Sequence, residues 1–512
     1  MKFRRSPPPV KADIGLLLEG TYPFIRGGVS SWVHQMITGL PEYTFALFFL
    51  GGDRNHYGKQ QYELPANVTH LECHYLMDRQ DEARPSPRRG NPEAFASQWE
   101  LHEGFKSEAP IDPEILHEVF RNLGERGGIT REDFLHSQES WQMIDRSYRT
   151  YCTEPSFVDY FWTIRTMHAP LFTLARVARN MPRVRVLHSI STGYAGLLGT
   201  IASDLHKLPF VISEHGIYTK ERKIDLSQAQ WIDDPSDQVS ENLSDQLGYI
   251  RRLWIRFFEA LGRLAYQKAD PIVSLYQGNR QRQLSDGAAP ERTRVIPNGI
   301  DPELFREVRE SRPQTTPMVL GLIGRVVPIK DIKTFIRAMR PVCETIPEAE
   351  GWIVGPEDED PVYVQECRDL VISLGLQEKV RFLGFRNVSE ILPQLGLMVL
   401  TSISEALPLV ILEAHAAGLP CLATDVGACR ELLEGAQPED QALGVSGAVV
   451  PIADPEATAR EAIRLLTDHQ AWKSAQKAGL ERVQRYYTLS SMFDQYRDIY
   501  NEALAPLLEE HS

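Results

Sequence analysis

Residues 318–331, MVLGLIGRVVPIKD, begin with an apolar run of strand length and continue into a loop that carries two basic side chains. A helical pattern follows from Ile332 to about Ile346, and the alternation of apolar run and amphipathic segment then repeats. Near-continuous apolar strands separated by amphipathic helices are typical of a parallel sheet covered on both faces. The stretch therefore predicts a doubly wound α/β domain in the C-terminal half.

Further apolar runs extend this pattern toward the C-terminus. They predict strands at 351–355, 380–384, 397–401, 420–424 and 448–451. The segments between them predict helices near 361–375, 388–394, 407–418 and 428–434. Before the first of these strands, the polar and Pro-containing segment 306–317 is typical of an interdomain linker. We expect a Rossmann-like domain over residues 306–487.

The N-terminal half repeats the same order of strands and helices. Apolar runs predict strands at 13–20, 44–52, 67–75, 185–190, 210–216 and 271–276. Helical spacing predicts helices at 29–40 and 240–268. We expect a second Rossmann-like domain over residues 1–305, completed by a C-terminal helix at 488–512.

An insertion interrupts the N-terminal half at about residues 78–180. Its polar first part, 78–150, has no strand-like run. Helices are expected near 113–123 and 131–150, and a mobile stretch near 80–95.

Composition restricts the class of protein. A chain of 512 residues exceeds the usual size of one hydrophobic core, so two or more domains are expected. The net charge of −14 argues against a nucleic-acid partner, which would favour a basic domain. No apolar run approaches the roughly 18 residues of a membrane span, and the basic N-terminus lacks the apolar core of a signal peptide. Six cysteines without a C-x-x-C pair favour a reducing compartment, so we expect a cytoplasmic protein.

Two carboxylates define the first candidate site, in Glu405-Ala-Leu-Pro-Leu-Val-Ile-Leu-Glu413. Pro408 suits the first turn of a helix, so Glu405 is expected in the loop at the carboxyl edge of the sheet. Glu413 is expected inside the helix, about 12 Å away at 1.5 Å per residue. This separation exceeds the ~5–9.5 Å between the two catalytic carboxylates of a glycosidase. It would let the two carboxylates accept hydrogen bonds from hydroxyls at opposite ends of a sugar nucleotide. The alternative is a surface Glu and an incidental helical Glu.

Basic and glycine residues extend this site. Arg325 directly follows Gly324 at the end of the first strand of the domain, and Lys330 comes five residues later. Both are well placed to bind a diphosphate, although a solvated pair has the same spacing. Gly427 precedes a short predicted helix, where backbone N–H groups can bind a phosphate.

The N-terminal domain contributes two further candidates. The pair Gly27-Gly28 follows the first strand and precedes a helix, so the backbone there can approach a ligand closely. Gly20, Gly27 and Gly28 do not have the G-x-G-x-x-G spacing of dinucleotide-binding proteins, which argues against an NAD or FAD oxidoreductase. His215 ends an apolar strand, where it either contacts a sugar or has a structural role.

Together these stretches resemble the retaining glycosyltransferases of family 4, which have the GT-B fold. The resemblance covers most of the chain outside 78–180. It rests on Gly27-Gly28, on PNGID at 297–301, on GRVVPIKD at 324–331 and on the E-x7-E pair. The stretches 16–35, 48–72 and 213–226 are also similar to the cytosolic glycosyltransferases of Pel exopolysaccharide (biofilm) biosynthesis. The loop VGACRE departs from the more usual VGG-x-x-E, which weakens the phosphate contact at Gly427.

The resemblance implies two Rossmann-like domains facing across a cleft, with a role for each matching residue. Arg325 and Lys330 would neutralise the donor diphosphate, Glu405 would bind sugar hydroxyls and Glu413 the ribose. His215 would contact the sugar. The implied donor-binding set is completed by Gly27, Gly28, Gly324, Phe385 and Leu409.

The implied function is a metal-independent transfer from a UDP-sugar to a growing polysaccharide, with retention at the anomeric carbon. No cofactor and no metal are expected. The expected partners are the UDP-sugar, the polysaccharide acceptor and an inner-membrane polysaccharide synthase complex that recruits the protein. Two alternatives stay open: a UDP-sugar epimerase of the same fold, and a non-catalytic UDP-binding scaffold of that complex. The donor sugar, the linkage and the oligomeric state are not determined by these motifs.

Overall fold

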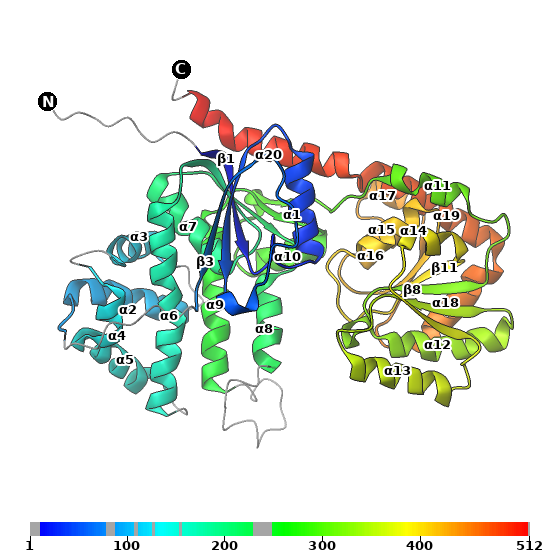
Figure 1. Ribbon diagram of the computed structural model, residues 1–512, viewed down its shortest axis with the longest axis horizontal. Helices are drawn as coiled ribbons and strands as arrows, with labels where there is room; N and C mark the ends of the chain where they lie inside the picture. Colours follow the sequence, from blue (N-terminus) through cyan, green and yellow to red (C-terminus); the bar gives the residue numbers. More distant parts are fainter. Residues whose placement is uncertain are drawn as a thin grey trace. The chain divides into compact units, whose positions relative to one another are not determined.

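The computed structural model describes residues 11–77, 88–106, 111–124, 128–152, 156–228 and 248–509. Its contacts divide the chain into two compact units, each built on a sheet with helices packed against it (Figure 1). Unit 1 comprises Met1–Ser274, Arg280–Arg294 and Arg497–Ser512, and unit 2 comprises Leu275–Asn279 and Val295–Tyr496. Most of the stretch expected to be mobile (80–87) and the first part of the helix expected at 240–268 (240–247) lie outside the described residues.

The first sheet has seven strands in the order β3-β2-β1-β4-β5-β6-β7. They are β1 (Ala12–Glu19), β2 (Phe45–Gly51), β3 (Val68–Tyr75), β4 (Val184–Ser189), β5 (Phe210–Glu214), β6 (Ile272–Ser274) and β7 (Thr293–Val295). The pairs from β3 through β6 are parallel, and Ile14 of β1 aligns with Phe45 and Val186 of its neighbours. All six predicted strands are confirmed, whereas the three-residue β7 was not predicted.

Helices surround this sheet and also form the insertion. Outside the insertion they are α1 (Gly28–Gly39), α7 (Tyr194–His206), α8 (Tyr218–Gln228), α9 (Tyr249–Lys268) and α10 (Gln277–Ser285). In the insertion they are α2 (Pro92–Lys106), α3 (Pro113–Asn122), α4 (Arg131–His136), α5 (Gln138–Tyr151) and α6 (Phe157–Asn180). The helices expected at 113–123 and 131–150 are present, the latter as two helices, while α2 and α6 were not predicted.

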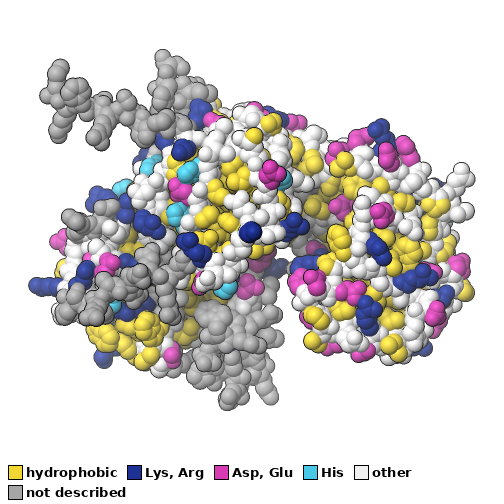
Figure 2. All heavy atoms as spheres, viewed as in Figure 1, with side chains coloured by type: hydrophobic (Ala, Val, Ile, Leu, Met, Phe, Trp, Pro, Cys, Tyr) yellow, Lys and Arg dark blue, Asp and Glu magenta, His cyan; other side chains and the backbone are white. Residues whose placement is uncertain are grey.

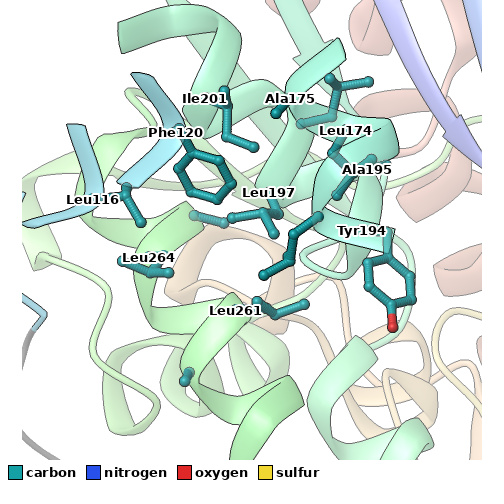
Figure 3. Close-up of a cluster of buried hydrophobic side chains, with 14 of the residues drawn as sticks. Leu116, Phe120, Leu174, Ala175, Tyr194, Ala195, Leu197, Ile201, Leu261 and Leu264 are labelled. Carbon is teal, nitrogen blue, oxygen red and sulfur yellow. The ribbon is translucent and has the colours of Figure 1, made fainter. Parts of the chain in front are cut away.

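The insertion shares its core with the first sheet domain. Figure 3 shows Leu116 and Phe120 of α3 beside Leu174 of α6, Leu197 of α7 and Leu261 of α9. All of these side chains are buried. Because apolar burial is the main favourable contribution to folding, the insertion helices are an integral part of this domain.

The second sheet has six strands in the order β10-β9-β8-β11-β12-β13, and all of its pairs are parallel. The strands are β8 (Val319–Ile323), β9 (Glu350–Val354), β10 (Val380–Gly384), β11 (Leu397–Leu400), β12 (Cys421–Thr424) and β13 (Gly447–Val450). Each lies within one residue of a predicted strand. The doubly wound domain predicted from residues 318–331 is therefore confirmed.

Helices cover both faces of the second sheet (Figure 1). One face carries α12 (Ile332–Thr345), α13 (Pro361–Ser373) and α18 (Pro455–Thr467). The other carries α14 (Val388–Ile391), α15 (Leu409–Ala416), α16 (Cys429–Glu434) and α19 (His469–Tyr486). Two short helices, α11 (Arg306–Glu310) and α17 (Pro438–Gln441), lie in the connecting segments. The two buried clusters explain why these strands are apolar on both sides.

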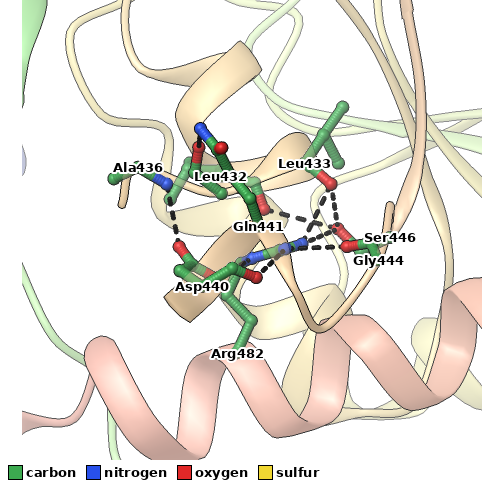
Figure 4. Close-up of polar contacts among 9 residues, drawn as sticks. Leu432, Leu433, Ala436, Asp440, Gln441, Gly444, Ser446 and Arg482 are labelled. Carbon is green, nitrogen blue, oxygen red and sulfur yellow. Dashed lines mark hydrogen bonds and ion pairs between the residues drawn. The ribbon is translucent and has the colours of Figure 1, made fainter. Parts of the chain in front are cut away.

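A buried ion pair fixes α19 to the segment between α16 and β13. The Arg482 guanidinium donates from Nε to Asp440 Oδ1 at 2.5 Å, and both side chains are almost fully buried. Figure 4 shows its remaining N–H groups directed at the carbonyl oxygens of Leu433 and Gly444 and at the hydroxyl of Ser446. The full set of hydrogen bonds makes burial of this charge tolerable.

The last helix, α20 (Leu489–Glu509), contributes its C-terminal part to unit 1. There Tyr500 and His188 share a hydrogen bond of 2.7 Å, and the Tyr43 hydroxyl donates to Asn501 at 2.8 Å.

On the face shown in Figure 2, acidic and basic side chains of unit 2 are interspersed. Across the described ranges, none of the helices combines the length and the apolar character needed to cross a bilayer.

Candidate functional site

The loops after β8 and β11 meet at the switch point of the second sheet. These two strands are neighbours, and the strand order runs away from them on both sides. In open parallel sheets, ligands bind at the carboxyl ends of the strands at such a point, because the adjoining loops turn to opposite faces. The loops involved here are 324–331 and 401–408.

An ion pair joins these two loops. The Lys330 ammonium donates to Glu405 Oε1 at 2.5 Å, and the side chains are only 19% and 14% exposed. The Thr401 hydroxyl donates to the carbonyl oxygens of Lys330 at 3.0 Å and of Asp331 at 2.9 Å. Asp331 has a left-handed backbone (φ 43°), and its carboxylate caps α12. The predicted Lys330 and Glu405 are thus brought together, whereas the supporting Thr401 was not predicted.

Arg325 lies in the same loop but forms a different contact. Its guanidinium donates to both carboxylate oxygens of Glu359, at 2.6 and 2.7 Å, and both side chains are about half exposed. Glu359 was not among the residues predicted for this site. It follows β9, the neighbour of β8, so its carboxylate lies at the same edge of the sheet. The acidic run after that strand was the signal that could have indicated it.

Glu413 and Leu409 lie on α15, which begins after the Glu405 loop. Both residues are partly buried. Burial raises the pKa of the Glu413 carboxyl above its ordinary value, since desolvation disfavours the charged form. A hydrogen-bond donor from a ligand would stabilise the carboxylate.

Gly427 is closely packed in this region, and Gly324 lies beside Lys330. Gly427 has φ +53°, and a Cβ there would collide with the carbonyl oxygens of Glu405 and Ala406. The N–H of Ala428 donates to the Ala406 carbonyl at 2.7 Å, so it already has a partner. A Cβ on Gly324 would lie 3.7 Å from the Lys330 side chain. The loops of Gly427, Glu405 and Lys330 therefore form one packed group.

Phe385 lies at the edge of the second sheet. It follows β10, the edge strand, which is separated from β8 by β9. Its side chain is 79% exposed. The structure therefore leaves this ring available at the surface.

The remaining predicted residues belong to unit 1. Gly27 and Gly28 lie at the start of α1, and a Cβ on either would meet no atom within 4 Å. His215 directly follows β5 and is 8% exposed, with its ring centroid 4.3 Å from that of Trp32. Its Nε2 has no hydrogen-bond partner among the described residues. Burial lowers the pKa of His215 to about 3, so the imidazole is neutral near pH 7.

Glu214, beside His215, forms a buried network that was not predicted. Its carboxylate accepts hydrogen bonds from Tyr266 at 2.5 Å and from Gln283 at 3.0 Å. Thr192 donates to it at 3.1 Å. Desolvation raises the pKa of the Glu214 carboxyl despite these donors. The network holds the end of β5, and with it His215, in place.

Over the described part of the chain, no three His, Cys, Asp or Glu side chains are grouped so that they could hold a metal ion. The predicted metal independence stays a prediction.

Two family models match the chain. The model described as a domain of unknown function, DUF3492, matches residues 12–291, and the model described as glycosyl transferases group 1 matches residues 317–468. The first match covers more than half of the chain, so the protein belongs to the DUF3492 family. The second places a group 1 glycosyl transferase domain on the sheet that carries Lys330 and Glu405.

Curated relatives are similar over parts of their length. An N-acetyl-alpha-D-glucosaminyl L-malate synthase of Bacillus anthracis is 29% identical over 177 residues, which is 34% of this chain and 43% of that protein. An exopolysaccharide phosphotransferase of Streptomyces coelicolor is 30% identical over 241 residues, which is 46% of this chain and 24% of that protein. The matches span between 24% and 56% of the length of the first such relatives.

Solved structures share the fold. Anabaena HepE in complex with UDP superposes with a TM-score of 0.58 at 16% identity, covering 96% of this chain and 100% of that one. Sucrose-phosphate synthase from Thermosynechococcus elongatus gives a TM-score of 0.54 at 17% identity, with the same coverage of both chains. The predicted fold of two Rossmann-like domains of the GT-B class is confirmed, and so is the predicted enzyme class at the level of the matched domain.

Proposed function

We propose that the protein is a retaining glycosyltransferase that moves a hexosyl or N-acetylhexosaminyl unit from a UDP-sugar to a growing exopolysaccharide. The observation that carries the proposal is the Lys330–Glu405 ion pair at the switch point of the second sheet. It combines a cation suited to a diphosphate with a carboxylate suited to sugar hydroxyls, in the domain that matches the group 1 glycosyl transferases.

In the proposed reaction, an acceptor hydroxyl oxygen bonds to the anomeric carbon while the bond from that carbon to the β-phosphate oxygen breaks. The electron pair of this bond leaves with UDP, and the acceptor proton passes to a phosphate oxygen. Negative charge therefore grows on the diphosphate. Lys330 and Arg325 would stabilise that charge, because preorganised cations act most strongly where charge develops.

The acids have a positioning role in this proposal. Glu405 would accept hydrogen bonds from sugar hydroxyls while it holds Lys330 in place, and Glu413 would accept from the ribose. His215 would act as a neutral hydrogen-bonding group, since its pKa of about 3 leaves it uncharged at neutral pH. Gly27 and Gly28 would let the backbone at the start of α1 approach the phosphate or the acceptor.

The exopolysaccharide role is supported by the similarity to the Pel subgroup and by the name of the Streptomyces coelicolor relative. We further propose that the reaction needs no metal ion, and that the protein acts in the cytoplasm, recruited to an inner-membrane synthase complex.

The test is a panel of UDP-glucose, UDP-GlcNAc and UDP-GalNAc, each incubated with the full-length protein and a polysaccharide acceptor, with and without EDTA. We expect one donor to release UDP at the same rate in both conditions, and the new linkage to have the donor's anomeric configuration by NMR. Release of an epimerised UDP-sugar without transfer would assign the protein to the epimerases instead. Failure to bind UDP in calorimetry would overturn the proposal as a whole.

A further inference from the structure

A pocket of about 250 Å³ lies in unit 1, away from the residues discussed so far. It lies where the end of α2, the end of α5 and the start of α9 come together. Within the described ranges, its lining residues are Lys106, Tyr151, Tyr249, Arg252, Leu253 and Arg256. Three of these six are cations and two are tyrosines, which is an unusual composition in a chain with a net charge of −14.

The α9 side of the pocket is a single helical face. Tyr249, Arg252, Leu253 and Arg256 follow the spacing i, i+3, i+4, i+7, so they lie above one another on the helix. Leu253 is buried, whereas Arg256 is exposed. Tyr249 and Arg252 lie in the first turn of α9, where the helix dipole favours negative charge.

On the opposite side, Lys106 is held in a fixed position. Its ammonium donates to the Ser147 hydroxyl at 2.7 Å and to Glu103 Oε1 at 3.3 Å, and it lies 3.8 Å from the centre of the Tyr151 ring. The buried Tyr160 hydroxyl donates to Ser147 at 2.6 Å. The Lys106 side chain is only 11% exposed. The ammonium is thus preorganised at the wall of the pocket.

Among the described residues, the Glu103 carboxylate contacts the Lys106 ammonium, and three cations line the pocket. Burial lowers the pKa of the Lys106 ammonium to about 8, so its charged form is destabilised in the absence of an anion. A buried cation that lines a pocket, although its burial lowers the stability of the folded state, is typical of a binding residue.

We propose that this pocket binds a small phosphate ester carried on a ring, such as a sugar phosphate or a nucleoside monophosphate. Two guanidinium groups and an ammonium suit a phosphate, and the faces of Tyr151 and Tyr249 suit a ring. The volume is just below the ~300–1,000 Å³ of pockets that enclose drug-sized ligands, so a whole nucleotide sugar is too large. The inference does not depend on the proposed glycosyltransferase reaction.

The test is isothermal titration of the full-length protein with glucose 1-phosphate and with UMP. Glucose, uridine and inorganic phosphate serve as matched probes for the ring alone and for the anion alone. We expect one or both esters to bind more tightly than their parts, and the double variant R252Q/R256Q to weaken that binding at least about tenfold. The control Arg149→Gln removes a largely exposed arginine that pairs with Asp145 on α5, and it should change nothing.

A second measurement avoids variants altogether. Acetylation of wild-type lysines at pH 8, followed by mass spectrometry, should show Lys106 protected by the ester and not by glucose or uridine. Equal ester affinity in R252Q/R256Q and wild type, or unchanged Lys106 acetylation, would overturn the proposal. If inorganic phosphate binds as tightly as the esters, the pocket does not recognise a ring and that part of the proposal is wrong.

Discussion

The Lys330 ammonium lies 2.5 Å from Glu405 Oε1, and this pair joins the loops after β8 and β11, the two strands that flank the switch point of the second sheet. Both side chains are largely buried, so their attraction is weakly screened by solvent. A diphosphate that approaches Lys330 must therefore share it with Glu405. An ammonium has three N–H groups, so in the proposed reaction Lys330 would bind the diphosphate while it keeps its contact with Glu405, which would bring the diphosphate and the sugar hydroxyls beside each other.

Lys330→Ala tests the cation directly. We expect the rate of sugar transfer to fall roughly 10²–10³-fold, as when a donor to a developing oxyanion is removed. UDP release measured at saturating donor separates this loss from weaker binding. The matched control is Lys333→Ala, because Lys333 pairs with Glu366 between α12 and α13. If both variants lose activity equally, Lys330 has no special role.

Glu413→Gln tests the partly buried carboxyl on α15. Its folded-state pKa is raised above the ordinary value of 4.5. Between 4.5 and the raised pKa, the native state therefore binds more protons than the unfolded state. Stability therefore decreases as pH rises through this window, by at most about 1.4 kcal/mol per pH unit. The variant should lack this decrease in urea unfolding and should bind UDP more weakly. Exposed Glu378→Gln should behave as wild type.

Acid should destabilise the protein through His215. Its pKa is lowered from 6.5 to about 3 in the folded state, so the unfolded state binds the extra proton between these values. Stability then falls as pH drops below about 6.5, by about 1.4 kcal/mol per unit for one such group. His215→Asn should reduce this slope in urea titrations at pH 7.5, 6.5 and 5.5. The exposed control His469→Asn should leave it unchanged.

The sheets could be predicted from the sequence because every buried parallel strand is an apolar run, as in Val319–Ile323. The helices of the insertion could not. α2 is largely polar in sequence and α6 contains Pro170 in its interior, so contacts with the rest of unit 1 favour both helices against their local signals. β7 was missed because three residues give no periodicity.

The candidate site could be predicted in part for a related reason. Lys330 and Glu405 each follow an apolar strand, and that placement alone predicts the same edge of a sheet. Glu359 required the order of the strands, which local sequence does not contain. The network around Glu214 depends on Tyr266 and Gln283, which are distant in sequence. Such contacts are established only by the fold.

Removal of one partner of the buried pair Arg482–Asp440 should destabilise unit 2 strongly. Arg482→Met leaves the Asp440 carboxylate buried without its partner, and removal of one member of a buried pair costs about 3–5 kcal/mol. Chemical unfolding measures this loss. The control Arg340→Met, at an exposed pair with Glu344 on α12, should produce no comparable change. A loss below 1 kcal/mol for Arg482→Met, about that of an exposed pair, would contradict the assignment.

Gly427→Ala should damage the donor site more than the fold. Alanine at φ +53° is strained, and its Cβ would collide with the carbonyl oxygens of Glu405 and Ala406, so the Glu405 loop has to shift. A shift that costs about 1.4 kcal/mol of binding weakens UDP affinity about tenfold in calorimetry. Gly375→Ala is the matched control, because its φ is +70° and a Cβ there meets no atom within 4 Å. Both variants have a strained backbone, but only in Gly427→Ala does the new Cβ collide with neighbouring atoms. Equal UDP affinities of the two variants would therefore show that the Glu405 loop does not hold the donor.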